Sequence, residues 1–448
     1  PLLPPFYIIF KLFNKKSFHS DVYIFIHGVA GFFLIKVLDT GINFMTQIFL
    51  ARVMSIEDYG YFVYVVNWIT VLVLFCKIGF DTLLLRYVIS YSTIKNWGRL
   101  KGLLRSGNFI VLVMSLLVSL LTGLIIKSID YKISITLANT FWIACVILPF
   151  TALAQLQKAS LQSLKHVVLA SLPQRIINPI LLILFVIVSC FCVGQPLSSP
   201  TVMAYKMAAT MVSFFLSLFL LSKHLPEKLK YSICEYENLE WIKVSIPLLF
   251  ISGMYVVMRQ TDILMLGFFL DSKDVGIYSA SVRIASLMGF GLVAINSIFA
   301  PMISQLYIKK QYTELQNIVT LASRILFGYS LFIAIALILI GKYLLSLFGM
   351  VFHSGYTPLN ILLIGQFVSS IVGSVGYLMI MTGHQKQASK IVGGCVFINF
   401  LLNYTFIPQW GLTGAAIATG FTTALLNIMM YLYVKKKINI NSMFIRMK

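Results

Sequence analysis

Long apolar segments recur along almost the whole chain, and only short connections separate them. An α-helix needs about 20 apolar residues to cross the roughly 30 Å hydrocarbon core of a bilayer. Twelve such segments can be placed, and none alternates apolar and polar residues as a barrel strand does. Their approximate bounds are 29–51, 61–80, 103–126, 134–156, 168–193, 202–222, 242–270, 276–305, 320–341, 357–382, 388–407 and 411–434. The pattern predicts an all-α membrane protein of about twelve transmembrane helices.

The composition agrees with a membrane protein and not with a soluble one. Hydrophobic residues make up 59% of the 448 residues, charged residues make up 11%, and the mean hydropathy is +0.90. Soluble proteins carry roughly 25% charged residues. The net charge of +21 would suggest nucleic-acid binding in a soluble chain. Here the basic residues lie beside apolar segments, so we expect no nucleic-acid partner.

The lysines and arginines are divided unevenly between alternate connections. One set of connections, which includes both ends of the chain, carries 24 of the 35. The other set carries only five, namely Arg52, Lys127, Lys132, Lys273 and Lys342. Because cytoplasmic loops of membrane proteins are enriched in Lys and Arg, we expect the first set and both termini in the cytoplasm. An extra or missing span would mix the two sets, so the division supports the count of twelve.

Two sequence similarities relate the first six segments to the last six. Residues 55–62 follow the first segment with the sequence SIEDYGYF, and residues 271–278 follow the seventh with DSKDVGIY. Asn178 in the fifth segment corresponds to Asn399 in the eleventh. These matches predict a six-plus-six repeat of parallel orientation, an arrangement that transporters use around a site near the membrane midplane. We therefore expect two six-helix bundles around a central cavity.

The longest connection lies in the middle of the chain and joins the two expected bundles. It carries four glutamates, as is typical of a solvated linker. The expected parts are a cytoplasmic N-terminal segment (1–28), an N-terminal bundle (29–222), a cytoplasmic linker (223–241), a C-terminal bundle (242–434) and a basic cytoplasmic tail (435–448).

Motifs for catalysis, metal binding and nucleotide hydrolysis are absent from the sequence. The six cysteines form no CxxC pair, and the six histidines form no HExxH motif. The P-loop pattern is also missing, so the chain is not itself an ATPase. We expect no metal, no cofactor and no catalytic residue, and hence a transporter rather than an enzyme.

The six basic residues outside both sets of connections fall inside the apolar segments, where charge is costly. They are Lys36, Lys77, Arg175, Lys206, Arg259 and Arg283. A charged residue at a helix centre costs about 2.5–3.5 kcal/mol on insertion scales, so six facing lipid would cost about 15–20 kcal/mol. That sum exceeds the net stability of most folds. We expect Lys206, near the outer end of its segment, to extend to the membrane surface. The other five are the candidate substrate-binding residues of a cationic cavity.

Two acidic residues each lie three positions after one of these bases. Asp39 follows Lys36, and Asp262 follows Arg259. Residues three apart share a helix face, so each acid is expected to pair with its base. Each pair is either a structural ion pair that lowers the cost of insertion or a site where substrate phosphate or a proton competes for the charge. The sequence leaves both possibilities open, and the two acids are candidates for ion coupling or charge pairing.

Motifs along almost the whole chain carry a family resemblance. The most distinctive stretch is Asn399 and Asn403 followed by Ile407-Pro408, Gly411 and Gly414-Ala415-Ala416. Others are Leu50 through Gly60, Lys77 through Gly79, Leu85 through Tyr87, Asp262, Val275 through Ala280, and Pro301. With these motifs the sequence resembles the oligosaccharide flippases of the multidrug/oligosaccharidyl-lipid/polysaccharide superfamily, and the Wzx-type O-antigen flippases in particular.

The resemblance implies two six-helix bundles around a cationic central cavity. It also implies a function: alternating access turns a polyprenyl-pyrophosphate-linked oligosaccharide, such as the repeat unit of O antigen in lipopolysaccharide biosynthesis, from the cytoplasmic to the periplasmic leaflet of the cell inner membrane. The implied partners are this lipid-linked substrate, the bilayer, the polysaccharide polymerase and the chain-length machinery. Arginine suits a pyrophosphate because its planar fork stays cationic, and lysine binds it as a point charge.

Two other functions remain as alternatives. Efflux of drugs or cations, in the multidrug branch of the same superfamily, would favour an anionic cavity, whereas the segments carry six bases against two clear acids. A polysaccharide polymerase or ligase would favour a large external loop, and the longest one expected here has about fifteen residues (342–356). The sequence leaves open the sugar, the glycan pathway, the coupling ion and the oligomeric state.

The uneven distribution of basic residues predicts the topology, which reporter fusions test. Reporters are expected in the cytoplasm when fused after Lys165, Lys230, Lys390 or Lys437. They are expected in the periplasm when fused near Asp58, Ser199 or Gly355. Two or more fusions on the wrong side would exclude the twelve-span arrangement.

Overall fold

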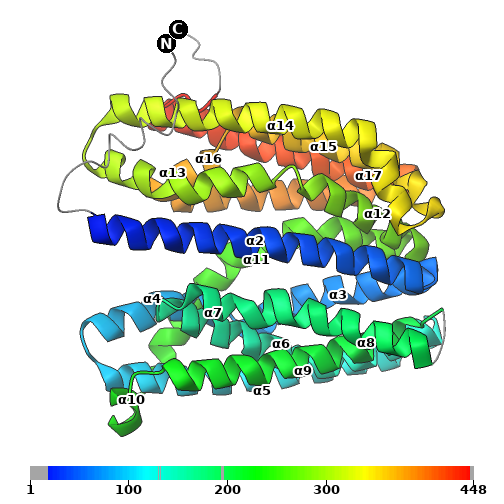
Figure 1. The fold of residues 1–448 in the computed structure, drawn as a ribbon, viewed down its shortest axis with the longest axis horizontal. Helices are drawn as coiled ribbons and strands as arrows, with labels where there is room; N and C mark the ends of the chain where they lie inside the picture. Colours follow the sequence, from blue (N-terminus) through cyan, green and yellow to red (C-terminus); the bar gives the residue numbers. More distant parts are fainter. Residues whose placement is uncertain (1–18, 130, 132, 193–195, 444–448) are drawn as a thin grey trace.

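The computed structural model describes residues 19–129, 131, 133–192 and 196–443, and nearly all of them are helical (Figure 1). Within this part of the chain, β pairing is limited to one isolated bridge between Met54 and Leu197. The predicted fold class, an all-α membrane protein, is confirmed.

The first half of the chain forms long helices joined by short turns. They are α2 (His19–Val53), α3 (Ile56–Lys77), α4 (Phe80–Thr93), α5 (Trp97–Ile129), α6 (Ile135–Ser163), α7 (Val167–Leu172), the π-helix η2 (Pro173–Ile177), α8 (Asn178–Cys192) and α9 (Ser199–His224).

The second half begins after a short helix, α10 (Lys228–Tyr231). Its helices are α11 (Asn238–Phe269), α12 (Ser272–Ser286), α13 (Phe290–Ile308), α14 (Tyr312–Phe348), the 3-10 helix η3 (Met350–Gly355), α15 (Tyr356–Val372), α16 (Val375–Met381) and α17 (Gln385–Lys437).

These helices account for the predicted spans. Nine helical stretches of the described residues are long and apolar enough to cross a membrane. One of them, α17, has 53 residues, or roughly 80 Å at 1.5 Å per residue, and it kinks at Gly411. The φ of 56° at Gly411 suits glycine, so α17 contains two of the predicted spans. With α2 and the α12–α13 pair, the count reaches twelve.

Three spans that were predicted as continuous helices are interrupted. Ile78 and Gly79 have φ values of 47° and 79° and separate α3 from α4. A second break divides α12 from α13, and a third lies at Gly373, whose φ is 82°. At Gly79 a side chain would meet the backbone of Ser245 in α11, which explains why the chain turns at a glycine there. Broken helices of this kind are common in transporters.

The helices form two groups, and α2 and α11 lie between them (Figure 1). Helices α3 to α9 make one group, and α12 to α17 make the other. Helix α2 contacts α7 and α8 of the first group and α13 and α14 of the second. Helix α11 contacts α3 and α4 as well as α17. The predicted two-bundle arrangement is therefore present, with two helices placed to couple the bundles.

The repeat seen in the sequence also appears in the hydrogen bonds. Asn178 Nδ2 donates to Thr210 Oγ1 at 3.2 Å and thereby ties α8 to α9. Asn399 Nδ2 donates to Thr422 Oγ1 at 3.0 Å and ties the two parts of α17 together. Both asparagines lie in the fifth span of their half and bond to the sixth. The same bond thus recurs in both halves.

The two halves pack closely at the end of the molecule where α3 and α12 begin. A side chain at Gly60 of α3 would meet the backbone carbonyl of Ser272 in α12. A Cβ on Gly276 would lie 3.5 Å from the Cα of Gly60. The ring of Tyr59 packs edge-on against Phe352 of η3 at 5.8 Å between centroids. We call this contact of α3, α12 and η3 the closed end.

Arg52, the second-last residue of α2, adds a polar contact between the halves at the same end. Its Nε donates to the Leu347 carbonyl at 2.6 Å, and its Nη2 donates to the Ser346 carbonyl at 2.5 Å. Both carbonyls belong to the last turn of α14, where a cation also interacts favourably with the helix dipole. The guanidinium therefore links the two halves.

The linker between the halves docks on the first turns of α5. Arg99 pairs with Glu237 at 2.9 Å, and the Glu235 amide donates to the Gly98 carbonyl at 3.1 Å. Lys101 Nζ donates to the Ser232 carbonyl at 2.9 Å. The expected linker of 223–241 is thus partly helical, since α9 continues to 224 and α11 begins at 238.

The chain beyond α17 returns to the second half. Helix α17 continues through Lys437, inside the tail that was expected to start at residue 435. Ser323 Oγ of α14 donates to the Ser442 carbonyl at 2.6 Å, and Ser442 Oγ donates to the Val372 carbonyl at 2.8 Å. This stretch of the expected tail is therefore packed between α14 and α15.

Gly60→Ala is expected to destabilise the protein, because the new methyl group must displace the start of α12. Overpacking of this kind costs about 1–3 kcal/mol. The matched control is Gly328→Ala in α14, where nothing lies within 4 Å of the new carbon. Alanine is a better helix former than glycine by about 1 kcal/mol, so the control should melt at the same or a higher temperature. Equal melting temperatures for the two variants in detergent would contradict the close contact.

Candidate functional site

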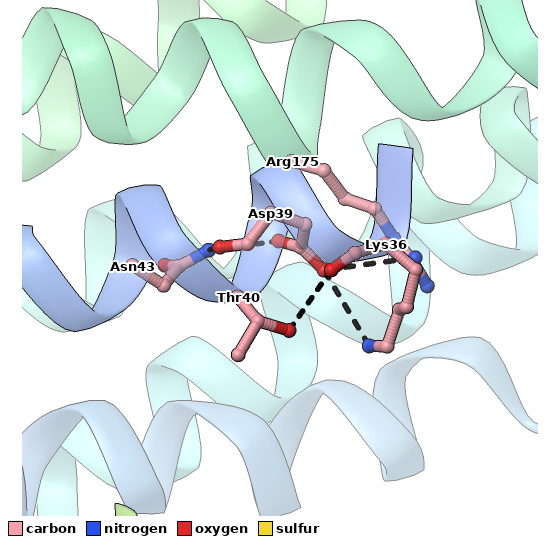
Figure 2. Close-up of polar contacts among 5 residues, drawn as sticks. All are labelled: Lys36, Asp39, Thr40, Asn43 and Arg175. Atoms are coloured by element: carbon pink, nitrogen blue, oxygen red, sulfur yellow. Dashed lines mark hydrogen bonds and ion pairs between the residues drawn. The ribbon is translucent and has the colours of Figure 1, made fainter. Parts of the chain in front are cut away.

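Three predicted site residues meet beside α2. Asp39 Oδ2 lies 3.5 Å from Lys36 Nζ of the same helix and 3.6 Å from Arg175 Nη1 of η2 (Figure 2). Asn43 Nδ2 donates to Asp39 Oδ1 at 2.8 Å and fixes the carboxylate from its other side. The predicted pair of Lys36 and Asp39 is confirmed, and the structure adds Arg175 to it.

Arg175 owes its position to an irregular turn. Residues 173–177 form a π-helix, in which the Asn178 amide bonds to the Pro173 carbonyl five residues back. Proline has no N–H to donate, which weakens the regular ladder at this point. Single π turns inside α-helices occur frequently at functional sites. The wider turn carries Arg175 to the carboxylate of Asp39 on α2.

Lys77 forms a separate ion pair at the break between α3 and α4. Its Nζ lies 2.6 Å from Asp81 Oδ2, and the Lys77 side chain is only 11% exposed. Asp81 also accepts the Thr82 amide at 2.9 Å. The predicted segment ended at residue 80, so Asp81 was assigned to a connection and its ion pair with Lys77 was not predicted. The two residues are four apart, which is the spacing of an ion pair within a helix.

Lys158 of α6 joins this group of charges. Its ammonium interacts electrostatically with Arg175, Asp39, Lys36 and Lys77. The sequence placed Lys158 in a cytoplasmic connection because the apolar segment ended near residue 156, but α6 continues to residue 163. The helical pattern of the sequence continues past Lys158, and this continuation could have placed Lys158 inside the helix.

We call six charged residues the α2 charge cluster: Lys36, Lys77, Lys158, Arg175, Asp39 and Asp81. The cluster contains four bases and two acids, so its net charge is +2.

Arg283 lies apart from this cluster, near the closed end. Its charge interacts electrostatically with the buried hydroxyl of Tyr59, which donates to Gln47 Oε1 at 3.2 Å. The Nε atom of Arg283 is buried and has no hydrogen-bond partner in the part of the chain described. The ammonium of Lys206 in α9 interacts electrostatically with Arg283. We had expected the Lys206 side chain to extend to the membrane surface. Its charge instead interacts with Arg283 of the other half.

The predicted pair of Arg259 and Asp262 is wrong. Asp262 is 3% exposed and accepts hydrogen bonds from the Tyr278 hydroxyl at 2.8 Å and the Thr419 hydroxyl at 3.2 Å. Arg259 is exposed and forms no ion pair with Asp262. The helix presents the two side chains in different directions, because Asp262 faces α12 and α17 and takes its hydrogen bonds there.

Arg259 nevertheless shares a helix face with buried core residues. Ile263 and Leu266 follow it by four and seven residues, and both belong to the hydrophobic cluster that extends across the two halves. The structure therefore brings Lys36, Arg175 and Asp39 together, and it places Lys77 in a separate ion pair with Asp81 that interacts electrostatically with the same Lys158. It places Arg283 in a second location, and Arg259 and Asp262 in two others.

Metal binding finds no support in the described residues. They contain no group of three or more His, Cys, Asp or Glu side chains that could hold a metal ion. All six cysteines are free. What the α2 charge cluster can do chemically is bind an anion through charge-assisted hydrogen bonds from lysine and arginine.

Solved structures that share this fold are membrane transporters. The chain aligns over 90% of its length with 94% of a multidrug resistance MATE family transporter of the MOP superfamily in its inward-facing conformation, at a TM-score of 0.69 and 14% identity. It aligns over 93% of its length with 95% of a MOP superfamily transporter from Pyrococcus furiosus whose binding pocket is described as having reverse polarity, at a TM-score of 0.62 and 13% identity. At these identities the likeness shows the fold alone, that of a class of polytopic membrane proteins whose solved members include MOP superfamily transporters.

Family models assign the chain within that class. The model described as "Polysaccharide biosynthesis protein" matches residues 25–307, which is more than half of the chain. The MatE model matches residues 247–405. The chain belongs to the polysaccharide biosynthesis protein family, in agreement with the flippase resemblance of its sequence motifs.

Two curated relatives are proteins of Haloferax volcanii. The first is the "Probable low-salt glycan biosynthesis flippase Agl15", 23% identical over 183 residues, or 40% of this chain. The second is the "Probable flippase AglR", 27% identical over 171 residues, or 35% of this chain. The matched regions span 38% and 34% of those two proteins.

Asp39→Asn is expected to reduce the stability and the membrane abundance of the protein, because Lys36 and Arg175 lose their shared countercharge. Breaking a buried pair costs about 3–5 kcal/mol, and the lower end applies here because the Lys36 side chain is 31% exposed. Thermal unfolding in detergent and immunoblots of membranes measure the two effects.

The control for this prediction is Glu57→Gln, which neutralises an exposed acid of α3 and should leave both measurements unchanged. The double variant Asp39→Asn with Arg175→Gln should recover part of the stability, since it removes one of the two stranded cations. Asp39→Asn and Glu57→Gln behaving alike would show that the carboxylate is not the required countercharge.

Proposed function

We propose that this protein is a flippase that moves a polyprenyl-pyrophosphate-linked oligosaccharide from the cytoplasmic to the outer leaflet by alternating access. The single observation that supports the proposal most is the net positive charge of the α2 charge cluster. Lys36, Arg175 and Lys77 form ion pairs with Asp39 or Asp81, and Lys158 interacts electrostatically with all three bases and with Asp39. Lys77, Lys158 and Arg175 lie in helical stretches long and apolar enough to span a membrane. A pyrophosphate group would supply the missing negative charge.

The chemistry of the cluster suits such a group. Arg175 provides a planar fork of donors, and Lys36, Lys77 and Lys158 provide mobile point charges. Asp39 and Asp81 already neutralise part of the positive charge. They therefore lower the free-energy cost of keeping these bases within the membrane when no substrate is bound. An incoming phosphate competes with these carboxylates for the same bases, so binding and release need only an exchange of partners.

The position of the cluster agrees with uptake from the cytoplasm. Lys77 lies 21 residues after the first residue of α3, so it is roughly 32 Å along the helix from the closed end. The distribution of lysine and arginine between the connections supports a cytoplasmic location for that far end of the bundle. In this arrangement the cluster receives substrate from the cytoplasm while the closed end seals the outer side.

Efflux of drugs or cations is the alternative, and the MatE match over residues 247–405 is the observation that favours it. An organic cation needs an accessible acid. Asp262, the buried acid of α11, already accepts hydrogen bonds from two hydroxyl groups and the Ile263 amide. The charges of the described spans therefore favour an anionic substrate.

Several finer points belong to the same proposal. We infer a location in the cell inner membrane, with both termini in the cytoplasm and with the boundaries of the two bundles at 29–222 and 242–434. Arg259, which is exposed on α11, would contact the substrate from the second half. The proposed pathway is O-antigen or a related surface polysaccharide, with the polymerase and chain-length machinery as downstream partners.

Deletion of the gene in its source cell tests this function. We expect surface glycan to disappear while lipid-linked repeat units persist on the cytoplasmic side. Complementation with Arg175→Lys, which keeps the charge and removes the fork, should restore membrane abundance but only part of the glycan. Complementation with Lys127→Gln, a change at an exposed lysine of α5, should restore both. Intact surface glycan together with altered drug tolerance in the deletion strain would establish efflux instead.

A further inference from the structure

A short non-helical segment follows the last helix and packs back onto the second half. Helix α17 ends at Lys437, and Asn439 takes the left-handed conformation with a φ of 56°. Asparagine tolerates this conformation, which commonly ends a helix, so the chain leaves the helix axis there. Every second side chain around this point is buried: Ile438, Ile440 and Ser442. Such alternation is typical of an extended strand with one face inward. We call residues 438–443 the strap.

One side-chain amide of α14 fixes the backbone of the strap. Gln316 Oε1 accepts the Asn441 N–H at 2.8 Å, and Gln316 Nε2 donates to the Asn441 carbonyl at 2.7 Å. The Tyr431 hydroxyl of α17 donates to Asn441 Oδ1 at 3.3 Å. Ile438 and Ile440 add apolar contacts within a cluster that also contains residues of α13 to α17. The strap is therefore docked by hydrogen bonds to its backbone and by two buried side chains.

Ser442 connects the strap to the break between α15 and α16. Its Oγ donates at 2.8 Å to the carbonyl of Val372, which is the last residue of α15. The last carbonyls of a helix have no intrahelical partner, and Ser442 supplies one from a distant part of the chain. The Ser442 carbonyl in turn accepts a hydrogen bond from Ser323 Oγ of α14 at 2.6 Å. The strap thus caps the end of α15 and ties it to α14.

Gly373, the residue at the break, leaves the room that the strap occupies. Its φ of 82° lies in the region that favours glycine. A Cβ at this position would lie 2.8 Å from the Ser442 carbonyl oxygen and 2.5 Å from Ser323 Oγ. A larger residue therefore cannot share this space with the strap. The conformation of the break and the docking of the strap depend on each other.

The break at Gly373 departs from the six-plus-six repeat. The fourth span of the first half is α6, which continues as one helix from Ile135 to Ser163. The fourth span of the second half is divided into α15 and α16. The repeat therefore indicates a second conformation for this span, a single continuous helix, and the strap packs at the point where the two halves differ.

We propose that the strap is a conformational switch of the second half. When docked it holds the break at Gly373, and when detached it allows α15 and α16 to join into one helix. In the joined helix the Val372 carbonyl would accept the N–H of Gly376, four residues further on, in place of the Ser442 hydroxyl. The carbonyl then has a partner in both states, so the change leaves no buried acceptor unpaired. This inference does not depend on the substrate that the protein carries.

Hydrogen–deuterium exchange of the purified full-length protein in detergent tests the switch. Gln316→Ala removes two hydrogen bonds to the strap. One hydrogen bond changes an equilibrium about fivefold, so the amides of residues 438–443 should exchange about 25-fold faster. The amides of residues 374–377 should exchange more slowly, because the first N–H groups of α16 gain helical partners in the joined helix. The matched control is Ser389→Ala in α17, whose hydroxyl bonds within its own helix, and it should exchange like the wild type.

Gly373→Ala tests the switch from the side of the break. The new methyl group would overlap the docked strap, and alanine favours a continuous helix. We expect the same pair of changes, with faster exchange at residues 438–443 and slower exchange at residues 374–377. Gly376→Ala is the matched control, because the nearest atom to its new carbon is Met430 Sδ at 3.8 Å. The strap amides should exchange in this control as in the wild type.

The opposite signs of the two changes separate a switch from a segment that only adds stability. Faster exchange of both segments in Gln316→Ala and Gly373→Ala would overturn the proposal. Faster exchange of residues 438–443 with no change at residues 374–377 would overturn it as well. Ser442→Ala, which removes one hydrogen bond, is the milder variant. It should show the same opposite changes, with strap exchange about fivefold faster.

Discussion

A charge inside a bilayer has to be balanced by an opposite charge or by water, and the first half of this chain is organised around one such balance. Asp39 on α2 holds Lys36 from its own helix and Arg175 from the π turn. The irregular backbone at residues 173–177 brings the arginine to that carboxylate. The choice of helix neighbours therefore depends on an electrostatic requirement as well as on apolar packing.

Interruptions in the helices serve the same requirement. Lys77 and Asp81 flank the break at Gly79 and remain in contact across it, so their charges are balanced although the helix is interrupted there. The glycine itself permits close approach of α11. Backbone irregularity inside a membrane is tolerated where protein surrounds it, and these breaks lie at such contacts between helices.

The sequence was sufficient for features that follow from repetition and spacing. Apolar length gave the number of spans, and matching asparagines revealed the repeat that the Thr210 and Thr422 bonds display. Spacing of three residues predicted the Lys36–Asp39 pair correctly but the Arg259–Asp262 pair wrongly. Spacing within one helix says nothing about competitors on other helices, and Tyr278 and Thr419 provided better partners for Asp262. Lys158 was missed because α6 continues to residue 163, beyond the end of the apolar segment, and the expectation for Lys206 did not include Arg283 because that residue lies in a distant part of the chain.

The matching hydrogen bonds of Asn178 and Asn399 show that the two halves are structural repeats. Only the first half, however, carries the α2 charge cluster. Equal halves would present the substrate with two equivalent poses related by rotation about the membrane normal. In the proposed flippase, unequal halves would leave one pose, with the phosphates of the substrate held against the first half. The hydrocarbon tail of the lipid-linked substrate would then leave the protein laterally in a single direction. Under that proposal, a two-fold scaffold with charges in one half would act as an asymmetric lateral port.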